Sequence, residues 1–143
     1  MTDNLSHNYT GRCLCGAVTY EIVGEPVIVA QCHCGECRRL SGTGHTIGAM
    51  FDSKNVALNG QLGEFKYSSG NKYVVTKGFC IKCGSQIFGR NTRLPDHITI
   101  PLGSMNDTTG LNVQVVIFAR DKMHWDELGP DVAVFDTQPD WKP

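Results

Sequence analysis

Hydrophobic and polar residues alternate in several short segments of the chain. Over residues 17–23 the alternation places Val18, Tyr20 and Ile22 on one face, and a glycine follows at once. A period of two residues is typical of a β-strand with one buried face. We therefore predict a strand here, with these three side chains in the core.

Further strands follow from the same kind of pattern or from short apolar runs bounded by glycine and proline. The predicted strands cover residues 27–31, 45–51, 62–69, 72–79, 85–89, 97–102 and 113–119. Between two of them, Gly70 and Asn71 form a good hairpin turn. No window of about 11 or more residues has a helical period, so helix is expected only as a turn over residues 35–40. The predicted fold class is all-β.

The length and the residue pattern indicate a single domain. The 143 residues suit one hydrophobic core. We expect residues 1–10 to form a flexible polar tail and residues 11–125 to form the domain. Residues 126–143 are expected to form an irregular, acidic tail that packs on the domain.

The composition excludes several classes of protein. Hydrophobic residues make up 41% and charged residues 19%, which is typical of a globular chain and not of a disordered one. The formal net charge of -1 provides no general attraction to nucleic acid. No apolar stretch approaches the roughly 20 residues of a membrane span, and the N-terminus lacks the pattern of a signal peptide. These features predict a cytoplasmic protein with no membrane or nucleic-acid partner, and they leave its oligomeric state open.

Seven cysteines are the strongest chemical signal in the chain. An odd number argues against a disulfide scaffold and favours metal binding. One pair, Cys13 and Cys15, lies on an extended segment, where alternate side chains point the same way. A second pair, Cys80 and Cys83, has the spacing of a zinc knuckle, and Gly84 can take the left-handed conformation that closes it. The two pairs together predict a structural zinc site of four thiolates.

The other cysteines lie in the stretch C-H-C-G-E-C-R-R-L-S-G and are Cys32, Cys34 and Cys37. They supply three ligands to a second zinc ion, so we expect two ions per chain. His33 lies inside the stretch, but in an extended segment it points away from its neighbours. His45 and His97 are possible fourth ligands from a distance. We favour an open fourth position.

A zinc ion held by three thiolates suits certain reactions better than others. The electron-rich, soft site favours a thiol as its next ligand. A thiol bound as a thiolate can add to an electrophile such as an aldehyde, and the reverse reaction cleaves a carbon–sulfur bond. Arg38 and Arg39 follow directly and are candidates for binding substrate carboxylates. The loop over residues 41–44 can offer backbone N–H groups to an anion, and Glu36 and Asp107 are candidate general bases.

Three motifs of the chain resemble the glutathione-dependent formaldehyde-activating enzyme family, which includes centromere protein V. The motifs are G-R-C-L-C-G-A-V-T-Y at 11–20, C-H-C-G-E-C-R-R-L-S-G at 32–42 and G-F-C-I-K-C-G-S-Q-I-F at 78–88. G-S-M-N-D at 103–107 and Trp125 also match features of the family. The resemblance therefore covers most of residues 11–125.

The resemblance implies a β-tent fold, in which small antiparallel sheets surround a structural zinc. It implies a structural zinc on Cys13, Cys15, Cys80 and Cys83, and a second, catalytic and labile zinc on Cys32, Cys34 and Cys37. It also implies carbon–sulfur lyase activity, which joins formaldehyde and glutathione to S-(hydroxymethyl)glutathione. The formaldehyde-activating enzyme itself is longer than this chain, so we leave the thiol and the electrophile open.

Two other classes of function fit part of the pattern. Some β-tent proteins are non-enzymatic binding modules with one structural zinc, a role that does not need the second group of cysteines. Methionine sulfoxide reductases share the architecture, and here Cys34 and Cys37 could cycle between dithiol and disulfide. Full protection of the three clustered thiols by zinc would exclude this redox role.

Overall fold

The computed structural model describes residues 8–70 and 72–143, and strands dominate this part of the chain. Its regular elements are β1 (Asn8–Arg12), β2 (Thr19–Val23), β3 (Ile28–Cys32), α1 (Gly35–Ser41), β4 (Thr46–Asp52), η2 (Ser53–Asn55), β5 (Val56–Asn59), β6 (Leu62–Ser69), β7 (Tyr73–Cys80), β8 (Gln86–Asn91), β9 (His97–Pro101), η3 (Leu102–Ser104), β10 (Val115–Ile117), η4 (Ala119–Asp121) and β11 (Ala133–Val134). The prediction of an all-β fold is confirmed, with α1 as the one α-helix among the described residues.

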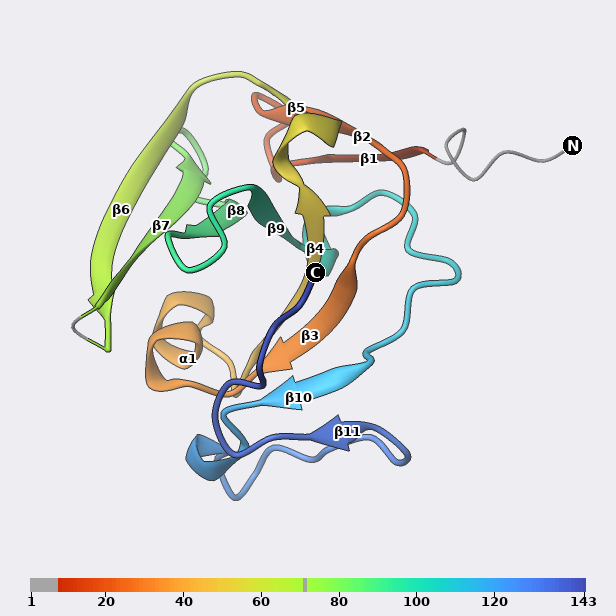
Figure 1. Ribbon diagram of the computed structural model, residues 1–143. Helices are drawn as coiled ribbons and strands as arrows, with labels where there is room; N and C mark the ends of the chain where they lie inside the picture. The colour runs from red at the N-terminus through yellow and green to blue at the C-terminus, as the bar shows by residue number, and fades with distance from the viewer. Residues whose placement is uncertain (1–7, 71) are drawn as a thin grey trace, which may run out of the picture.

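The strands form two sheets (Figure 1). The smaller sheet has the order β1-β2-β5, and both of its pairs are antiparallel. The larger sheet has the order β11-β10-β3-β4-β9-β8-β7-β6. It is antiparallel from β3 to β6, but β10 runs parallel to both β3 and β11. The antiparallel arrangement expected from the family resemblance therefore changes at the end of the larger sheet.

The alternation seen in the sequence sets which faces are buried. In β2, Tyr20 and Ile22 are buried while the residues between and beside them are exposed. Strand β1 pairs with β2 and buries Tyr9 in the same way. Strands β6 and β7 form the predicted hairpin, with Ser69 paired to Tyr73. Of the two predicted turn residues, Asn71 lies outside the described residues.

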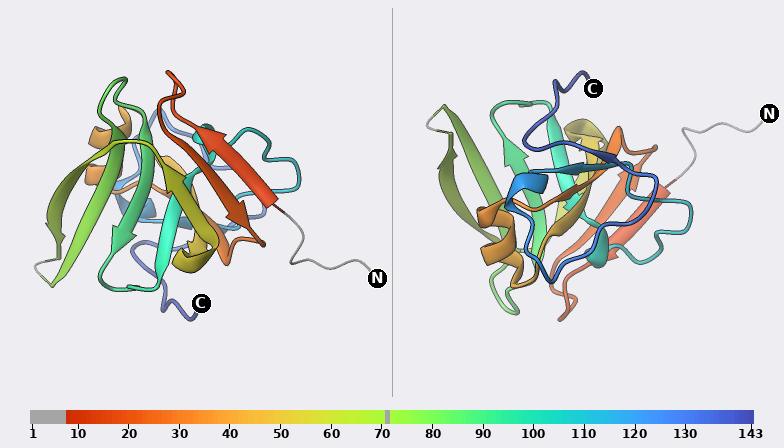
Figure 2. Two further views of the ribbon diagram at one scale, coloured as in Figure 1. Left: turned by 90° about the horizontal axis from the view of Figure 1, so that it is seen from above. Right: turned by 90° about the horizontal axis from the view of Figure 1, so that it is seen from below.

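The hydrophobic core lies between the smaller sheet and the middle of the larger one (Figure 2). Tyr9 of β1 contacts Phe51 of β4, with 5.9 Å between the ring centroids. An isolated backbone bridge also pairs Gly11 of β1 with Met105, which follows η3. The other fully buried side chains come from both sheets and include Ile22, Ile87, Ile98 and Ile100. Burial of this apolar surface is the main force that holds the two sheets together.

The larger sheet curves, and this curvature prepares a site. Strands β6 and β7 stand away from β3 and β10, and α1 lies between them at the open side of the curve (Figure 1). The helix follows β3 directly: Cys34 is its N-cap, and Gly42 closes its C-terminus in a left-handed conformation. The predicted helical turn over residues 35–40 is confirmed. Among the described residues no helix has the length and apolarity needed to cross a membrane.

Three strands were not predicted, and they alter the expected tails. Strand β1 begins at Asn8, inside the segment expected to be a flexible tail, and residues 1–7 of that tail lie outside the described residues. Strand β5 extends the smaller sheet. Strand β11 gives the expected C-terminal tail two residues of regular structure against β10. The sequences of β1 and β11 carry too little alternation to predict a strand, because the rest of the fold supplies their pairing.

Candidate metal centres and the cavity beside them

The first candidate metal centre joins the two sheets. Cys13 and Cys15 lie in the loop after β1, while Cys80 ends β7 and Cys83 lies in the following turn. Their four sulfur atoms all lie within 4.8 Å of one another. The Sγ atoms of Cys13 and Cys15 are 3.6 Å apart, and those of Cys15 and Cys80 are 3.8 Å apart. Zinc–sulfur bonds of about 2.3 Å in a tetrahedron place the sulfurs about 3.8 Å apart, so the group fits a zinc ion.

Backbone N–H groups hold these sulfurs in place. The Val18 N–H donates to the Sγ of Cys13 at 3.2 Å, and the Lys82 N–H donates to the Sγ of Cys80 at 3.4 Å. Gly84 has a φ of 78°, the left-handed conformation predicted from the sequence, and its N–H donates to the carbonyl of Cys80 at 2.8 Å. A residue with a Cβ would be strained at this φ. The knuckle geometry is therefore encoded locally.

Hydrogen bonds favour the thiolate form at two cysteines of this group. The pKa of Cys83 is lowered to about 5, first by a hydrogen bond with the Ser85 hydroxyl and then by backbone N–H groups. Burial acts to raise the pKa of Cys13, but the Val18 N–H and the thiols of Cys15 and Cys80 outweigh it and lower the pKa. At Cys15, a backbone N–H acts to lower the pKa, but burial and the neighbouring thiols outweigh it and raise the pKa to about 11. Thiolates are the form that binds zinc. The donor set therefore matches a structural four-thiolate site.

The second candidate metal centre comes from one short stretch of chain. Cys32 ends β3, Cys34 is the N-cap of α1, and Cys37 lies in its first turn. Their sulfur atoms lie within 4.8 Å of one another, and the Cys37 N–H donates to the Sγ of Cys34 at 3.3 Å. Among the described residues, no other cysteine, histidine or carboxylate joins this group. The structure thus brings together three ligands and leaves the fourth direction free.

The three sulfurs cannot all ionise without a cation. Hydrogen bonds from the thiols of Cys32 and Cys34 lower the pKa of Cys37 to about 2. The same contacts, seen from the other side, raise the pKa of Cys32 strongly, and the pKa of Cys34 rises to about 12. One thiolate therefore suppresses the ionisation of its neighbours, as expected for like charges at short range. A divalent ion removes this conflict, and the soft sulfur set fits zinc.

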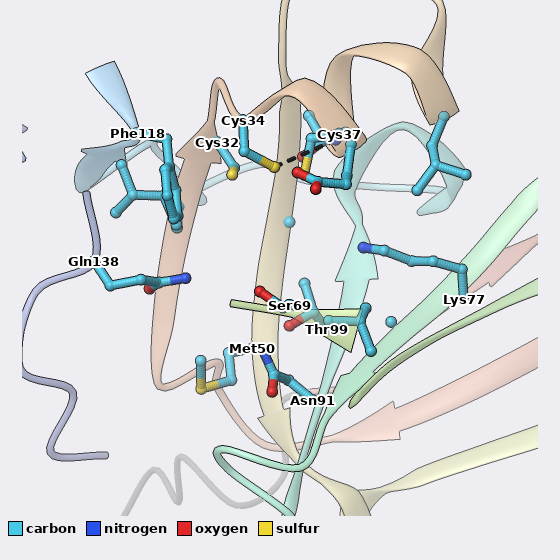
Figure 3. Close-up of a pocket in the computed structure, with 18 of the residues that line it drawn as sticks. Cys32, Cys34, Cys37, Met50, Ser69, Lys77, Asn91, Thr99, Phe118 and Gln138 are labelled. Atoms are coloured by element: carbon cyan, nitrogen blue, oxygen red, sulfur yellow. Dashed lines mark hydrogen bonds between the residues drawn. The ribbon is translucent and has the colours of Figure 1, made fainter. Parts of the chain in front are cut away.

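These cysteines open onto a large cavity of about 1220 Å³ (Figure 3). Its walls come from β3, β4 and β6–β9, from α1 and from the C-terminal segment. Figure 3 shows the sulfurs of Cys32, Cys34 and Cys37 grouped at one end, with the Lys77 side chain extending from β7 into the same space. The lysine charge contributes to lowering the pKa of Cys37. The metal centre and the cavity therefore form one continuous site.

Cationic side chains outnumber anionic ones on the cavity wall. The cations are Lys72, Lys77, Arg90, Arg93 and Arg120, and the anions are Glu36 and Asp121. Lys72 and Arg93 both lie over the ring of Tyr73, each 5.3 Å from its centroid. Arg90 donates to the Ser53 hydroxyl at 3.1 Å. Such a wall favours an anionic ligand.

The C-terminal segment completes the cavity. Phe118 lines it and has a φ of 55°, a conformation that is uncommon for a residue with a bulky side chain. Its N–H donates to the Thr137 carbonyl at 3.3 Å, which holds the chain end across η4. Gln138 and Trp141 also line the cavity, and the Trp141 Nε1–H donates to the Gln138 amide oxygen. The segment expected to pack on the domain thus forms part of its wall.

The structure gathers some of the predicted site residues and separates others. Arg38 and Arg39 do not line the cavity, although they follow Cys37 directly. Glu36 does line it, whereas the Asp107 carboxylate accepts the Thr109 N–H outside it. Of the predicted anion loop, only Ser41 reaches the wall.

His33 and the two distant candidate ligands, His45 and His97, have other partners or positions. His33 is fully buried and points away from the cysteines, as predicted, with its Nε2 2.9 Å from the Gln31 amide nitrogen. His45 and His97 line the cavity but do not join the cysteine group. The Nδ1 of His45 instead lies 2.6 Å from the Asp126 carboxylate. Asp126 and Lys77 had no motif in the sequence, because only the folded chain brings them to this site.

Comparison with known proteins agrees with this geometry. The family model of the glutathione-dependent formaldehyde-activating enzyme matches residues 8–121. No curated protein matches the chain. A crystal structure of a Rhodobacter sphaeroides protein superposes with a TM-score of 0.57 at 20% sequence identity, over 88% of this chain and 98% of that one. That likeness shows a shared fold.

The match to the family model spans most of the chain and includes all seven cysteines. It also includes every strand from β1 to β10 and the helix that carries Cys37 and is capped by Cys34. The chain belongs to the glutathione-dependent formaldehyde-activating enzyme family.

Proposed function

We propose that this protein is a zinc-dependent carbon–sulfur lyase. It joins a thiol such as glutathione to formaldehyde or a similar small electrophile, and in reverse it cleaves such an adduct. The observation that carries the proposal is the group of three cysteines with a free fourth direction, open to a cavity with cationic walls. A purely structural centre does not need an open position.

Two zinc ions per chain follow from the two groups of cysteines. Cys13, Cys15, Cys80 and Cys83 hold the structural ion, and Cys32, Cys34 and Cys37 hold the catalytic one. The catalytic ion supplies a soft Lewis acid that favours the thiolate form of a substrate thiol. The cysteines themselves fix its position at the end of the cavity. The reducing cytoplasm, which contains glutathione, suits both the free thiols and this substrate.

The positive charges on the cavity wall favour a thiol substrate that carries negative charge. Glutathione carries two carboxylates, and arginine and lysine bind carboxylates through charge-assisted hydrogen bonds. Lys77 and Arg90 line the cavity and are better placed for this role than the predicted Arg38 and Arg39. The charge of Lys77 acts directly on the clustered cysteines, since it helps to lower the pKa of Cys37. Lys77 is our leading candidate for orienting the substrate beside the metal centre.

The test is the rate at which formaldehyde and glutathione exchange with their adduct. Exchange spectroscopy with ¹³C-labelled formaldehyde measures this rate at equilibrium, and the spontaneous rate is measured without protein. We expect the zinc-loaded protein to accelerate exchange and Cys32→Ser to leave only the spontaneous rate. Equal rates with and without protein would overturn the assignment for these two substrates, and other thiols and aldehydes would be compared in the same assay.

A further inference from the structure

A histidine and an aspartate that are far apart in the sequence meet beside the cavity. His45 lies just before β4, and Asp126 follows η4 in the C-terminal segment. The Nδ1–H of His45 donates to the Asp126 Oδ2, with 2.6 Å between the two atoms. The Nδ1 of His33 lies 3.3 Å from the same oxygen. The carboxylate therefore faces two imidazole rings.

Several contacts fix this carboxylate. The Lys122 ammonium donates to the Asp126 backbone carbonyl at 2.9 Å, which ties the segment into a tight turn. A Cβ at Gly44 would lie 2.2 Å from the Asp126 Oδ2, so only glycine leaves room for the carboxylate at this position. The neighbouring His33 is fully buried, and its ring centroid lies 5.0 Å from that of His45. The surroundings thus hold the carboxylate where it orients His45.

The other ring nitrogen of His45 is free to react. With Nδ1 bound to the carboxylate, Nε2 carries the lone pair of the neutral ring. The described part of the chain gives Nε2 no hydrogen-bond partner, while His45 lines the same cavity as the three clustered cysteines. About a quarter of its side chain is exposed, at 26%. A carboxylate on one nitrogen of an imidazole that lines the cavity is the arrangement of a general acid–base histidine.

The distances argue against a third metal site, although three possible ligands lie close together. Two ligands bound to zinc at about 2.0–2.1 Å and separated by roughly 90–110° lie about 3 Å or more apart. The 2.6 Å between His45 and Asp126 is shorter than this and is typical of a charge-assisted hydrogen bond. A shared proton explains the contact better than a metal ion.

We infer that His45 is the general acid–base residue of the reaction and that Asp126 is its positioning residue, an inference that rests on the proposed function. When the thiol binds as a thiolate, its S–H proton passes to the Nε2 of His45, and the sulfur then attacks the carbonyl carbon. The carbon–sulfur bond forms, and the π electrons of the carbonyl move to its oxygen. His45 then returns the proton to that oxygen, giving a hydroxymethyl thioether. No oxidant or reductant takes part, and the reverse sequence cleaves the adduct.

Three variants separate the chemistry of the imidazole from its structural role. His45→Asn places an amide nitrogen where Nδ1 was, so the bond to Asp126 can persist while the acid–base group is lost. Asp126→Asn keeps the imidazole and removes the charge that orients it. His124→Gln is the matched control, because His124 is an exposed histidine outside the cavity wall. Thermal unfolding and metal content would show that each variant is folded and loaded.

In the exchange assay we expect His45→Asn to slow the reaction by about 100-fold or more, with the thiol concentration dependence nearly unchanged. Added imidazole should restore part of the rate, since the cavity has room for it. Asp126→Asn should slow the reaction by about 10-fold or more, and His124→Gln should match the unmodified protein within about twofold. Loss of a metal ion from His45→Asn would overturn the inference.

The deciding measurement follows the thiol proton without depending on turnover. Glutathione is titrated calorimetrically into zinc-loaded protein at about pH 8, in buffers of different ionisation enthalpy, because a glutathione-like thiol is still largely protonated at that pH. The titratable groups beside His45 are Asp126 and His33, and the charges of Lys122 and Cys37 act on the neighbouring His33. We expect the unmodified protein and His124→Gln to release fewer protons to the buffer than His45→Asn, by about one per thiol bound. Equal release would overturn the role of His45 and leave the proposed function standing, whereas no thiol binding would overturn both.

Discussion

The two groups of cysteines use the same chemistry but differ in how the chain holds them. The four-cysteine group draws ligands from loops of both sheets, 65 residues apart at Cys15 and Cys80. The three-cysteine group comes from a single turn between β3 and α1. A metal in the first group ties distant segments together, so its binding energy contributes to folding. A metal in the second group ties only neighbours, so it can enter, leave or exchange ligands while the fold persists.

The comparison teaches which features separate a structural centre from a chemical one. Cys13 and Cys80 are each 1% exposed and sit in the main core, and backbone N–H groups satisfy their sulfurs. The clustered Cys32 and Cys34 are half-buried and line a cavity. Ligand number and sequence separation are readable from the sequence, whereas the cavity is not. Single substitutions can test each side of this contrast.

The largest effect is expected from breaking the four-cysteine group. Cys80→Ser removes a buried ligand and the tie between the sheets. Because zinc binding to such groups is worth about 10–16 kcal/mol and small domains have about 5–15 kcal/mol of stability, we expect no cooperative unfolding transition. Circular dichroism during heating measures this. A melting curve like that of the unmodified protein would show that the group is not structural.

Breaking the three-cysteine group should remove activity and spare the fold. Cys37→Ser takes away the cysteine whose pKa is lowered to about 2 by its neighbours and which lies in the first turn of α1. We expect a loss of adduct exchange of at least about 100-fold and a shift of melting temperature of only a few degrees. The paired readouts come from the exchange assay and from thermal unfolding. Loss of the cooperative unfolding transition in this variant would show that the three-cysteine group is also needed for folding, which contradicts the proposed difference between the two groups.

Removing a cavity cation should weaken substrate binding while both groups of cysteines keep all their sulfur atoms. Lys77→Met keeps the apolar stem and removes the charge that faces Cys37. We expect KM for glutathione to rise about 10-fold, equivalent to about 1.4 kcal/mol. Lys54→Met is the matched control, because Lys54 is 79% exposed and pairs with Asp52 outside the cavity. A similar change in KM for both variants would mean that the effect is one of general charge.

The smallest effect tests how the two halves of the four-cysteine group are joined. The Ser85 hydroxyl accepts the Leu14 N–H at 3.0 Å and lies 3.2 Å from the Sγ of Cys83, so it links the two pairs of cysteines. Ser85→Ala should lower the free energy of unfolding by about 1 kcal/mol, measured by urea denaturation. Ser68→Ala on the exposed face of β6 should change it by less than about 0.5 kcal/mol. An equal change in the free energy of unfolding for the two variants would show that the Ser85 hydroxyl does not couple the two pairs of cysteines.

The two groups of cysteines that could hold metal ions were easier to predict from the sequence than the cavity. Cysteine spacing and Gly84 report local geometry, so the division of ligands into four and three follows from the order of residues alone. The main strands could also be predicted, because β2 and its neighbours bury alternate side chains. Strand β1 could not, since its residues Asn8–Arg12 are mostly polar and only Tyr9 is a large buried side chain.

The arginines and the histidine–aspartate pair show why the rest of the site could not be predicted. Each residue of a helix turns by about 100°, so Arg38 and Arg39 leave the face on which Cys37 meets the cavity. His45 and Asp126 are 81 residues apart and carry no spacing signal. Their contact depends on the C-terminal segment crossing the end of the larger sheet. Adjacency in sequence was therefore a poor guide to the cavity wall.

The most direct test of an open catalytic centre is the zinc content per chain, measured before and after glutathione is added, with Cys32→Ser as the control. We predict two zinc ions in the unmodified protein. Glutathione should either displace one of them or, in the cobalt-substituted protein, change the absorption spectrum of one site. We predict one ion, unaffected by the thiol, in Cys32→Ser. A single ion in both proteins, with no response to glutathione, would contradict the existence of an open catalytic centre.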